Sequence, residues 1–199
     1  MLALFIIVRY IFLDRDGVLN RKMPEGAYVS DWAQFEWLPG AVEAVARMKR
    51  AGLTVIVVSN QRGIALGRVT TGELERLHHK MQDHLARNGA PLDAIYYCPH
   101  DHGECRCRKP DIGLFEQAFK TFPHAVAGNS VVIGDSLSDI QAGQRLGMKT
   151  IFIQGEPDRR KAGADAAANL AHAVAGSLLQ AVEEHLGLTV PGGRASEVE

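Results

Sequence analysis

Residues 5–20, FIIVRYIFLDRDGVLN, join an apolar run to a pair of aspartates. An apolar run of this length that ends at charged residues is typical of a buried strand, so we expect a strand over Phe5–Leu13. Arg9 interrupts the run, which is too short to cross a bilayer and lacks the small-residue cleavage site of a signal peptide. We therefore expect a cytoplasmic protein with no membrane partner.

Other apolar runs with the length and composition of strands follow along the chain, at Leu53–Val58, Ala94–Tyr97, Ser130–Ile133 and Lys149–Ile153. Between them, apolar residues recur at helical spacing. One such stretch is Ala41–Arg50, which ends before Gly52, and another begins at a capping box formed by Thr70 and Glu73. This alternation predicts an α/β fold, a Rossmann-like parallel sheet with helices on both faces.

Two later helices and the end of the chain complete this expectation. Helical spacing recurs over 114–119 and from Ser136 to Leu146. The Ala-rich segment 163–186 is expected to hold a short strand or turn and a final helix that is capped near Asn169 or Ser177. We expect one domain over residues 1–188 with no large cap domain, and a disordered tail over 189–199.

The composition limits the classes of partner. Lys and Arg number 22 against 23 Asp and Glu, so the chain has no charge excess that would attract nucleic acid. It contains three cysteines, and an odd count in a cytoplasmic chain argues against a disulfide framework. We expect a monomer that binds a small molecule and no nucleic acid.

Polar residues follow several predicted strands at their carboxyl ends, where the active sites of open parallel sheets lie. Asp14 and Asp16 follow the first strand, and Asp135 follows the fourth. A carboxylate that attacks a phosphate needs a divalent cation and a fixed ammonium to offset the negative charge. Asp14 and Asp135 suit Mg²⁺, and Lys109 in a connecting loop supplies the ammonium. We therefore predict a magnesium site, with the main-chain carbonyl of Asp16 as a further ligand.

The residues around this site have distinct predicted roles. Asp14 is the predicted nucleophile, and Asp16 can protonate the leaving oxygen and then take a proton from water. Ser59 and Asn60 can donate hydrogen bonds to the phosphate oxygens. Asp139 has two interpretations that stay open, a favourable charge at a helix N-terminus or a position behind the metal ligands. Each motif alone is weak, and it is their order along the chain that predicts a hydrolase of phosphate esters.

These motifs in this order resemble the haloacid dehalogenase (HAD) superfamily. The similarity runs from about Tyr10 to about Leu186. The resemblance implies that Asp14 forms an aspartyl-phosphate intermediate and that Asp16 is the acid/base residue found in the phosphatases and mutases of the superfamily. The expected enzyme is an Mg²⁺-dependent phosphoric monoester hydrolase.

A cluster of cysteines lies in the loop after the third predicted strand. Cys98, His100, Cys105 and Cys107 have the spacing C-x-H-x4-C-x-C, which supplies three thiolates and one imidazole for a structural Zn²⁺. His102 is a rival for the fourth ligand. A disulfide between residues two apart is strained, so zinc is the favoured interpretation. A site with four protein ligands is closed, and the metal is expected to order the loop without taking part in chemistry.

The zinc loop narrows the resemblance to subfamily IIIA, the branch that includes phosphatases of heptose bisphosphates and of histidinol phosphate. Residues 12–20, 59–67 and 96–100 are closer to the heptose enzymes. The resemblance implies a phosphorylated sugar as substrate, heptose 1,7-bisphosphate first, which loses its C7 phosphate in the supply of lipopolysaccharide or capsule precursors. By matching position, the implied substrate-binding residues are Arg15, Asn20, Tyr28, Asn60, Gln61, Arg62 and Arg108.

Departures from the heptose enzymes fall where specificity would be set. Arg62 stands where a small residue is common, Leu66 stands where Arg is common, and the loop over 21–29 is longer. Histidinol phosphate or another small phosphorylated metabolite is therefore the alternative substrate, and a non-catalytic module ordered by zinc is the alternative class. The remaining histidines have no metal spacing and are expected at the surface: His78, His79, His84, His124, His172 and His185.

Overall fold

The computed structural model describes residues 8–24, 26–160 and 162–189. Its strands are β1 Tyr10–Leu13, β2 Thr54–Asn60, β3 Ala94–Cys98, β4 Ser130–Gly134, β5 Lys149–Ile153 and β6 Ala173–Ala175. Its α-helices are α1 Ala41–Arg50, α2 Thr71–Arg87, α3 Gly113–Thr121, α4 Leu137–Arg145, α5 Ala164–Leu170 and α6 Leu178–His185. Short 3₁₀ helices lie at Trp32–Gln34, Ala127–Asn129 and Pro157–Arg159. The predicted order of strands and helices is confirmed apart from the additional helix α5. Strand β1 begins at Tyr10, and Phe5 to Ile7 lie outside the described residues.

The strands form one parallel sheet in the order β3-β2-β1-β4-β5-β6. The sheet thus has β1 between β2 and β4, with Leu13 opposite both Val57 and Ile133. The chain leaves β1 toward β2 on one side and later returns to β4 on the other side. This is a topological switch point, where the loops after adjacent strands diverge and leave a crevice for ligands. Asp14 lies directly at that point.

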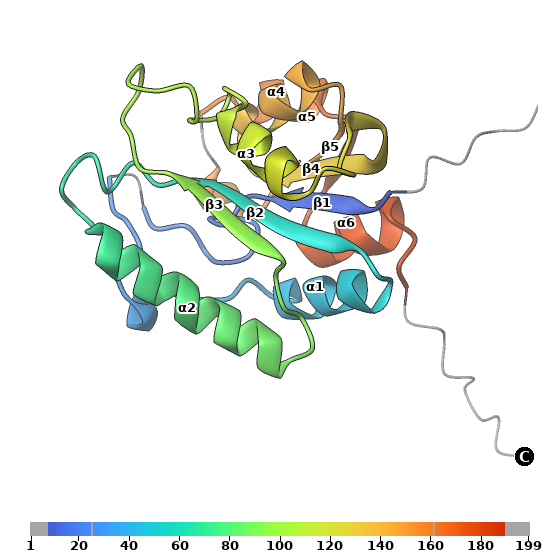
Figure 1. Cartoon of the computed structure of the whole chain (residues 1–199), viewed down its shortest axis with the longest axis horizontal. Helices are drawn as coiled ribbons and strands as arrows, with labels where there is room; N and C mark the ends of the chain where they lie inside the picture. The colour runs from blue at the N-terminus through green and yellow to red at the C-terminus, as the bar shows by residue number, and fades with distance from the viewer. Residues whose placement is uncertain (1–7, 25, 161, 190–199) are drawn as a thin grey trace, which may run out of the picture.

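Helices cover both faces of the sheet (Figure 1). The helices α1, α2 and α6 pack on one face, and α3, α4 and α5 pack on the other. Within β1, the side chains of Ile11 and Leu13 belong to the first core, while Phe12 points into the second, where its ring centroid is 5.3 Å from that of Phe115. Alternate residues therefore enter opposite cores, as expected for a strand that is buried on both faces.

The helix ends follow local chemistry. The Thr70 side chain and Glu73 form the predicted capping box at the start of α2. At the end of the chain, Ser177 caps α6 by accepting a hydrogen bond from the Gln180 N–H, which decides between the two predicted caps. Asn169 instead lies inside α5, a helix that was not predicted because its sequence, ADAAANL, has little apolar patterning.

The predicted tail and the membrane expectation concern residues at the end of the chain and the lengths of the helices. Apart from Thr189, the predicted disordered tail over 189–199 lies outside the described residues. Among the described residues, no helix is both long enough and apolar enough to span a membrane.

Candidate active site

Three buried carboxylates meet at the ends of two neighbouring strands. Asp14 follows β1, Asp135 follows β4, and Asp139 lies in the first turn of α4; their exposed fractions are 5%, 4% and 1%. One oxygen from each lies within 4.8 Å of the others. Carboxylate oxygens at this spacing are the hard donors that Mg²⁺ prefers, so this carboxylate cluster fits the predicted metal.

Lys109 places its ammonium inside the carboxylate cluster. Its Nζ lies 3.0 Å from Asp14 Oδ1 and 2.5 Å from Asp139 Oδ1, and it donates to the carbonyl of Val58 at 2.6 Å. Burial works against the charged amine, but the negative charges of Asp139 and Asp14 outweigh it and raise the pKa of Lys109. The ammonium is therefore a fixed cation beside the predicted nucleophile.

Asn60 holds the lysine in place. Its amide donates to the Lys109 carbonyl at 3.0 Å and accepts from the Lys109 N–H at 3.0 Å. Asn60 was predicted to bind substrate, and this contact remains a prediction. What the structure adds is that Asn60 supports Lys109.

Asp139 lies at the helix start, as one of its two open interpretations has it, and a position behind metal ligands remains a prediction. Its Oδ2 accepts hydrogen bonds from the main-chain N–H of Ser136 at 3.0 Å and from the hydroxyl of Ser136 at 2.5 Å, which caps α4. Its Oδ1 faces Lys109. A Cβ atom added to Gly134 would collide with the Asp139 side chain, so glycine at that position makes room for the carboxylate.

Asp16 has a different environment from Asp14. Its carboxylate accepts hydrogen bonds from Arg15 Nη2 at 2.9 and 3.0 Å, from Asn20 Nδ2 at 2.9 Å and from Gln61 Nε2 at 2.9 Å. Burial alone would favour the neutral acid, but the charge of Arg15 and the hydrogen bonds from Asn20 and Gln61 lower the pKa of Asp16 to about 2. Its side chain is 25% exposed and so remains open on one side.

Three of the predicted substrate-binding residues hydrogen-bond to the Asp16 carboxylate. Arg15, Asn20 and Gln61 are 1%, 0% and 7% exposed, and each hydrogen-bonds to Asp16. Direct contact of Arg15, Asn20 and Gln61 with a substrate remains a prediction; what the structure adds is that these side chains are buried against Asp16. Gln61 also donates to the hydroxyl of Ser59 at 2.8 Å, which links the loop after β2 to the loop after β1.

The prediction that His78 lies at the surface is wrong. His78 lies on α2, is 7% exposed, and its Nε2 is 3.0 Å from Arg15 Nη1. Burial and the positive charge of Arg15 lower the pKa of His78 to about 3. The neighbouring His79 is exposed, as predicted.

The other predicted substrate residues lie at the rim of the site. Arg62 pairs with Asp101, with Nε–Oδ1 and Nη2–Oδ2 distances of 2.5 and 3.1 Å. This pair raises the pKa of Arg62 and, through the same hydrogen bonds, lowers the pKa of Asp101 to about 2. Arg108 Nη1 donates to the carbonyl of His100 at 3.4 Å. Tyr28 packs over Gly63, where a Cβ atom would lie 2.9 Å from Tyr28 Cγ. Contact of these rim residues with a substrate remains a prediction.

Lys22 is a charged residue of the site that the sequence did not reveal. Its ammonium forms an ion pair with Asp135 Oδ2. Gly17 lies beside this pair with a φ of 92°, and a Cβ atom there would collide with the Asp135 carboxylate. The only available signal was the position of Lys22, shortly after the aspartate motif, and a lone lysine in a loop is more often solvated.

Four sulfur and nitrogen atoms meet in the loop after β3. The Sγ atoms of Cys98 and Cys105 are 3.5 Å apart, those of Cys105 and Cys107 are 3.2 Å apart, and His100 Nδ1 lies 3.7 and 3.4 Å from Cys98 and Cys107. Zinc–sulfur bonds of about 2.3 Å give a tetrahedron with edges of about 3.8 Å. The four atoms therefore fit a tetrahedral zinc site. His102 is exposed and lies outside this group.

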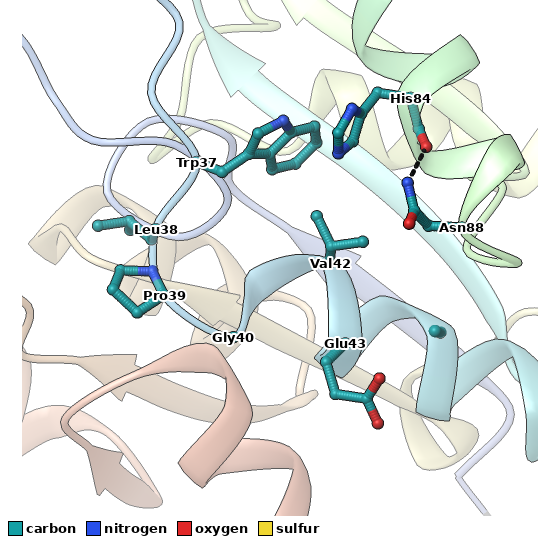
Figure 2. A pocket seen from close by; sticks show the side chains of 9 residues that line it. Trp37, Leu38, Pro39, Gly40, Val42, Glu43, His84 and Asn88 are labelled. Atoms are coloured by element: carbon teal, nitrogen blue, oxygen red, sulfur yellow. Dashed lines mark hydrogen bonds between the residues drawn. The ribbon is translucent and has the colours of Figure 1, made fainter.

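A hollow of about 510 Å³ lies away from the strand ends, between α1 and α2. Figure 2 shows the rings of Trp37 and His84 facing each other at its wall, with centroids 5.1 Å apart, and a hydrogen bond from Asn88 to the His84 carbonyl. Glu43 on its wall is paired with Arg47 and Arg50. None of the predicted catalytic residues lines it, so it is separate from the candidate active site.

Sequence and structure comparisons define the class. A profile described as HAD-hydrolase-like matches residues 106–181. The fold also superposes on a crystal structure with a TM-score of 0.79 and 31% identity, covering 92% of this chain and 100% of the other. The chain belongs to the HAD-like hydrolases and is a phosphatase, that is, a phosphoric monoester hydrolase. The expected superfamily, fold and enzyme class are confirmed.

Several of the similar proteins are heptose bisphosphate phosphatases. D-glycero-alpha-D-manno-heptose-1,7-bisphosphate 7-phosphatase of Mycobacterium tuberculosis is 40% identical over 132 residues, 66% of this chain and 69% of that protein. D-glycero-beta-D-manno-heptose-1,7-bisphosphate 7-phosphatase of Vibrio cholerae is 39% identical, over 72% of this chain and 79% of that protein. The crystal structure is a D,D-heptose 1,7-bisphosphate phosphatase from B. bronchiseptica complexed with magnesium and phosphate.

Proposed function

We propose that this phosphatase removes the C7 phosphate of D-glycero-D-manno-heptose 1,7-bisphosphate through an aspartyl-phosphate intermediate. Identities of about 40% to relatives with this activity support the substrate. The observation that carries the mechanism is the contrast between two aspartates two residues apart. Asp14 lies against a buried ammonium, and Asp16 is held by hydrogen-bond donors. Environments that differ in this way assign different roles to two carboxylates.

Asp14 is the nucleophile in this proposal. Its carboxylate oxygen bonds to phosphorus as the bond from phosphorus to the sugar oxygen breaks, which leaves an acyl-phosphate on Asp14. Lys109 stays 3.0 Å from Asp14 and offsets the negative charge of the transferred group. Ser59, which is 1% exposed and hydrogen-bonded to Gln61, is proposed to assist in holding the phosphoryl oxygens.

Asp16 is the acid and then the base. A pKa of about 2 makes it a carboxylate in the described structure, whereas a general acid must carry a proton. A dianionic phosphate beside it disfavours the charged carboxylate and raises its pKa, so substrate binding promotes its protonation. Asp16 then gives this proton to the leaving sugar oxygen and later takes one from the water that cleaves the acyl-phosphate.

The metal sites complete the proposal. Asp14 and Asp135 would hold Mg²⁺ through their carboxylates and Asp16 through its main-chain carbonyl, while Asp139 stays behind them on Lys109 and Ser136. When bound, Mg²⁺ supplies electrostatic stabilisation of the phosphoryl oxygens. Zn²⁺ would be held by the tetrahedral group in the loop after β3, made of Cys98, His100, Cys105 and Cys107.

We further propose that residues 1–188 form a single catalytic domain and that this enzyme acts as a monomer in the cytoplasm. Tyr28, Asn60, Arg62 and Arg108 bind the phosphorylated sugar, and the product supplies lipopolysaccharide or capsule precursors. Histidinol phosphate or another small phosphorylated metabolite remains the alternative substrate, because Arg62 stands where a small residue is common in the heptose enzymes.

The test compares kcat/KM on both anomers of heptose 1,7-bisphosphate, on a hexose bisphosphate and on histidinol phosphate, with Mg²⁺ present. We expect one heptose anomer to be preferred over histidinol phosphate by about tenfold or more, because a pocket built for two phosphates loses binding energy with one. A preference for histidinol phosphate, or flat activity across the panel, overturns the substrate. Asp14→Asn is expected to abolish every activity, including that on 4-nitrophenyl phosphate, while Asp158→Asn, whose side chain is 79% exposed, serves as the control.

A further inference from the structure

We propose that His78 is a positioning residue for catalysis: it accepts a hydrogen bond from Arg15 and thereby fixes the guanidinium that orients Asp16. This inference rests on the proposed role of Asp16 as acid and base. It extends the site by one residue that comes from α2 and lies 63 positions further along the chain than Arg15.

The direction of the hydrogen bond follows from chemistry. A guanidinium carries donors only, so the nitrogen of His78 that faces it must accept. His78 Nε2 is 3.0 Å from Arg15 Nη1, which places the imidazole proton on Nδ1 and leaves the ring neutral. The pKa of about 3 agrees with this assignment, because burial and the neighbouring positive charge both disfavour protonation. His78 is therefore a fixed acceptor at neutral pH.

The guanidinium uses its two ends differently. Arg15 Nη2 donates to both oxygens of Asp16 and to Gln61 Oε1 at 3.2 Å, while Nη1 donates to His78. The planar fork is rigid, so an acceptor at Nη1 sets the angle at which Nη2 meets the carboxylate. With a side chain only 1% exposed, Arg15 has little access to water that could replace that acceptor. Loss of the imidazole thus leaves a buried donor unsatisfied and the fork free to tilt.

The imidazole is itself held by its surroundings. The ring of Tyr97, on β3, meets it edge to face, with centroids 5.7 Å apart and an interplanar angle of 62°. On α2, Leu74, Leu77 and Met81 flank His78 and are all buried. A chain of contacts therefore runs from β3 and α2 through His78 and Arg15 to Asp16.

The experiment measures how strongly the rate depends on the leaving group. Phosphoryl transfer to Asp14 from 4-nitrophenyl phosphate releases a stable phenolate and needs little protonation, whereas an alkyl phosphate such as glycerol phosphate needs the proton from Asp16. We use kcat/KM because it reports this first step and not the later hydrolysis of the acyl-phosphate. The variants are His78→Leu, which removes the acceptor, His78→Gln, which restores one, and His79→Leu on the exposed neighbour as the control.

We expect His78→Leu to lower kcat/KM for the alkyl phosphate by about tenfold or more, within the contribution of general acid catalysis, and to lower it for the aryl phosphate by less than about threefold. His78→Gln is expected to recover most of the loss, and His79→Leu to change neither value. Equal losses on both substrates would overturn the proposal, because they would indicate a general structural defect. Unchanged kcat/KM values on both substrates in folded His78→Leu would also overturn it.

Failure of this inference is distinguishable from failure of the proposed function. If Asp14→Asn is inactive and Asp16→Asn lowers the alkyl rate more than the aryl rate, the proposed roles of the aspartates stand whatever His78→Leu does. If Asp16→Asn shows no leaving-group dependence, the acid role of Asp16 itself is wrong.

Discussion

The carboxylate cluster and the cysteine cluster both gather candidate metal ligands, but different forces hold them together. Asp14, Asp135 and Asp139 are buried at strand ends and at a helix start, and Lys109 and Lys22 already offset their charge. In the cysteine cluster Cys98 ends β3, while the other ligands lie on an exposed or half-exposed loop. Buried charges require counterions that belong to the fold, whereas a short polar loop has little core to order it and depends on its ion.

The largest expected effect comes from removing the built-in cation. Lys109→Met takes the ammonium away from two buried carboxylates, which should lower the free energy of unfolding by about 3–5 kcal/mol in metal-free buffer. Activity should fall about 100- to 1,000-fold, since a fixed donor to the transferred phosphate is lost. Urea unfolding and steady-state kinetics measure the two effects.

The addition of Mg²⁺ tests whether Lys109→Met loses stability because it lacks a positive charge. Excess Mg²⁺ should restore part of the stability of Lys109→Met, because a cation among the carboxylates replaces the missing charge. Lys120→Met, at an exposed position of α3, should match the unmodified protein. Equal stability of Lys109→Met and the unmodified protein without metal would show that the carboxylate cluster does not depend on its lysine.

A smaller effect is expected at the cysteine cluster. Cys107→Ser should abolish zinc binding and open the loop over 99–108 to proteolysis, while the global unfolding transition changes little. Because Arg108 and Lys109 follow the last ligand directly, kcat/KM should fall by about tenfold, as for supports of a functional group. Metal analysis, limited proteolysis and kinetics measure these outcomes.

His102 supplies the matched comparison for the cysteine cluster. His102→Ala should keep one zinc per chain and full activity, because this imidazole is exposed and outside the tetrahedral group. Loss of zinc from His102→Ala but not from His100→Ala would show that His102, and not His100, is the fourth ligand.

The two clusters also differ in how far the sequence could predict them. The sequence spacing alone predicted one cluster of four residues, because ligands a few residues apart can meet within one loop. These residues are Cys98, His100, Cys105 and Cys107. The carboxylate cluster needed the strand order as well, and the expectation that active-site residues follow parallel strands was sufficient to find Asp14 and Asp135. Both predictions used features that can be read from the sequence: the ligand spacing within one loop, and the position of polar residues directly after predicted strands.

Side-chain direction was the part that could not be predicted. Arg15 lies between two site residues, and an arginine there is expected to face solvent or substrate, yet it turns inward to Asp16 and His78. A signal for His78 did exist, since it lies four residues after Leu74 and three before Met81 on the buried face of α2. Helical spacing predicts burial for any residue on such a face, but a histidine there is buried only if a partner satisfies it, and Arg15 comes from a distant part of the chain.

The smallest expected effect concerns the ion pair that joins the two regions. Arg62 follows β2 beside the candidate active site, and Asp101 lies in the loop that carries the cysteine cluster. A partly exposed pair contributes little to stability, so neither Arg62→Gln nor Asp101→Asn should shift the unfolding transition measurably. Both variants should change kcat/KM on 4-nitrophenyl phosphate by less than about twofold, because this substrate has no second phosphate.

The bisphosphate separates the two roles open to Arg62. If Arg62 contacts the non-reacting phosphate, Arg62→Gln raises KM for heptose 1,7-bisphosphate by about tenfold, the value of one charge-assisted contact, and leaves kcat nearly unchanged. Asp101→Asn keeps the guanidinium and releases it from its partner, so KM should stay constant or fall. An equal rise of KM in both variants would instead mean that the ion pair acts by placing the loop of the cysteine cluster, which would make this exposed loop a support for the buried site.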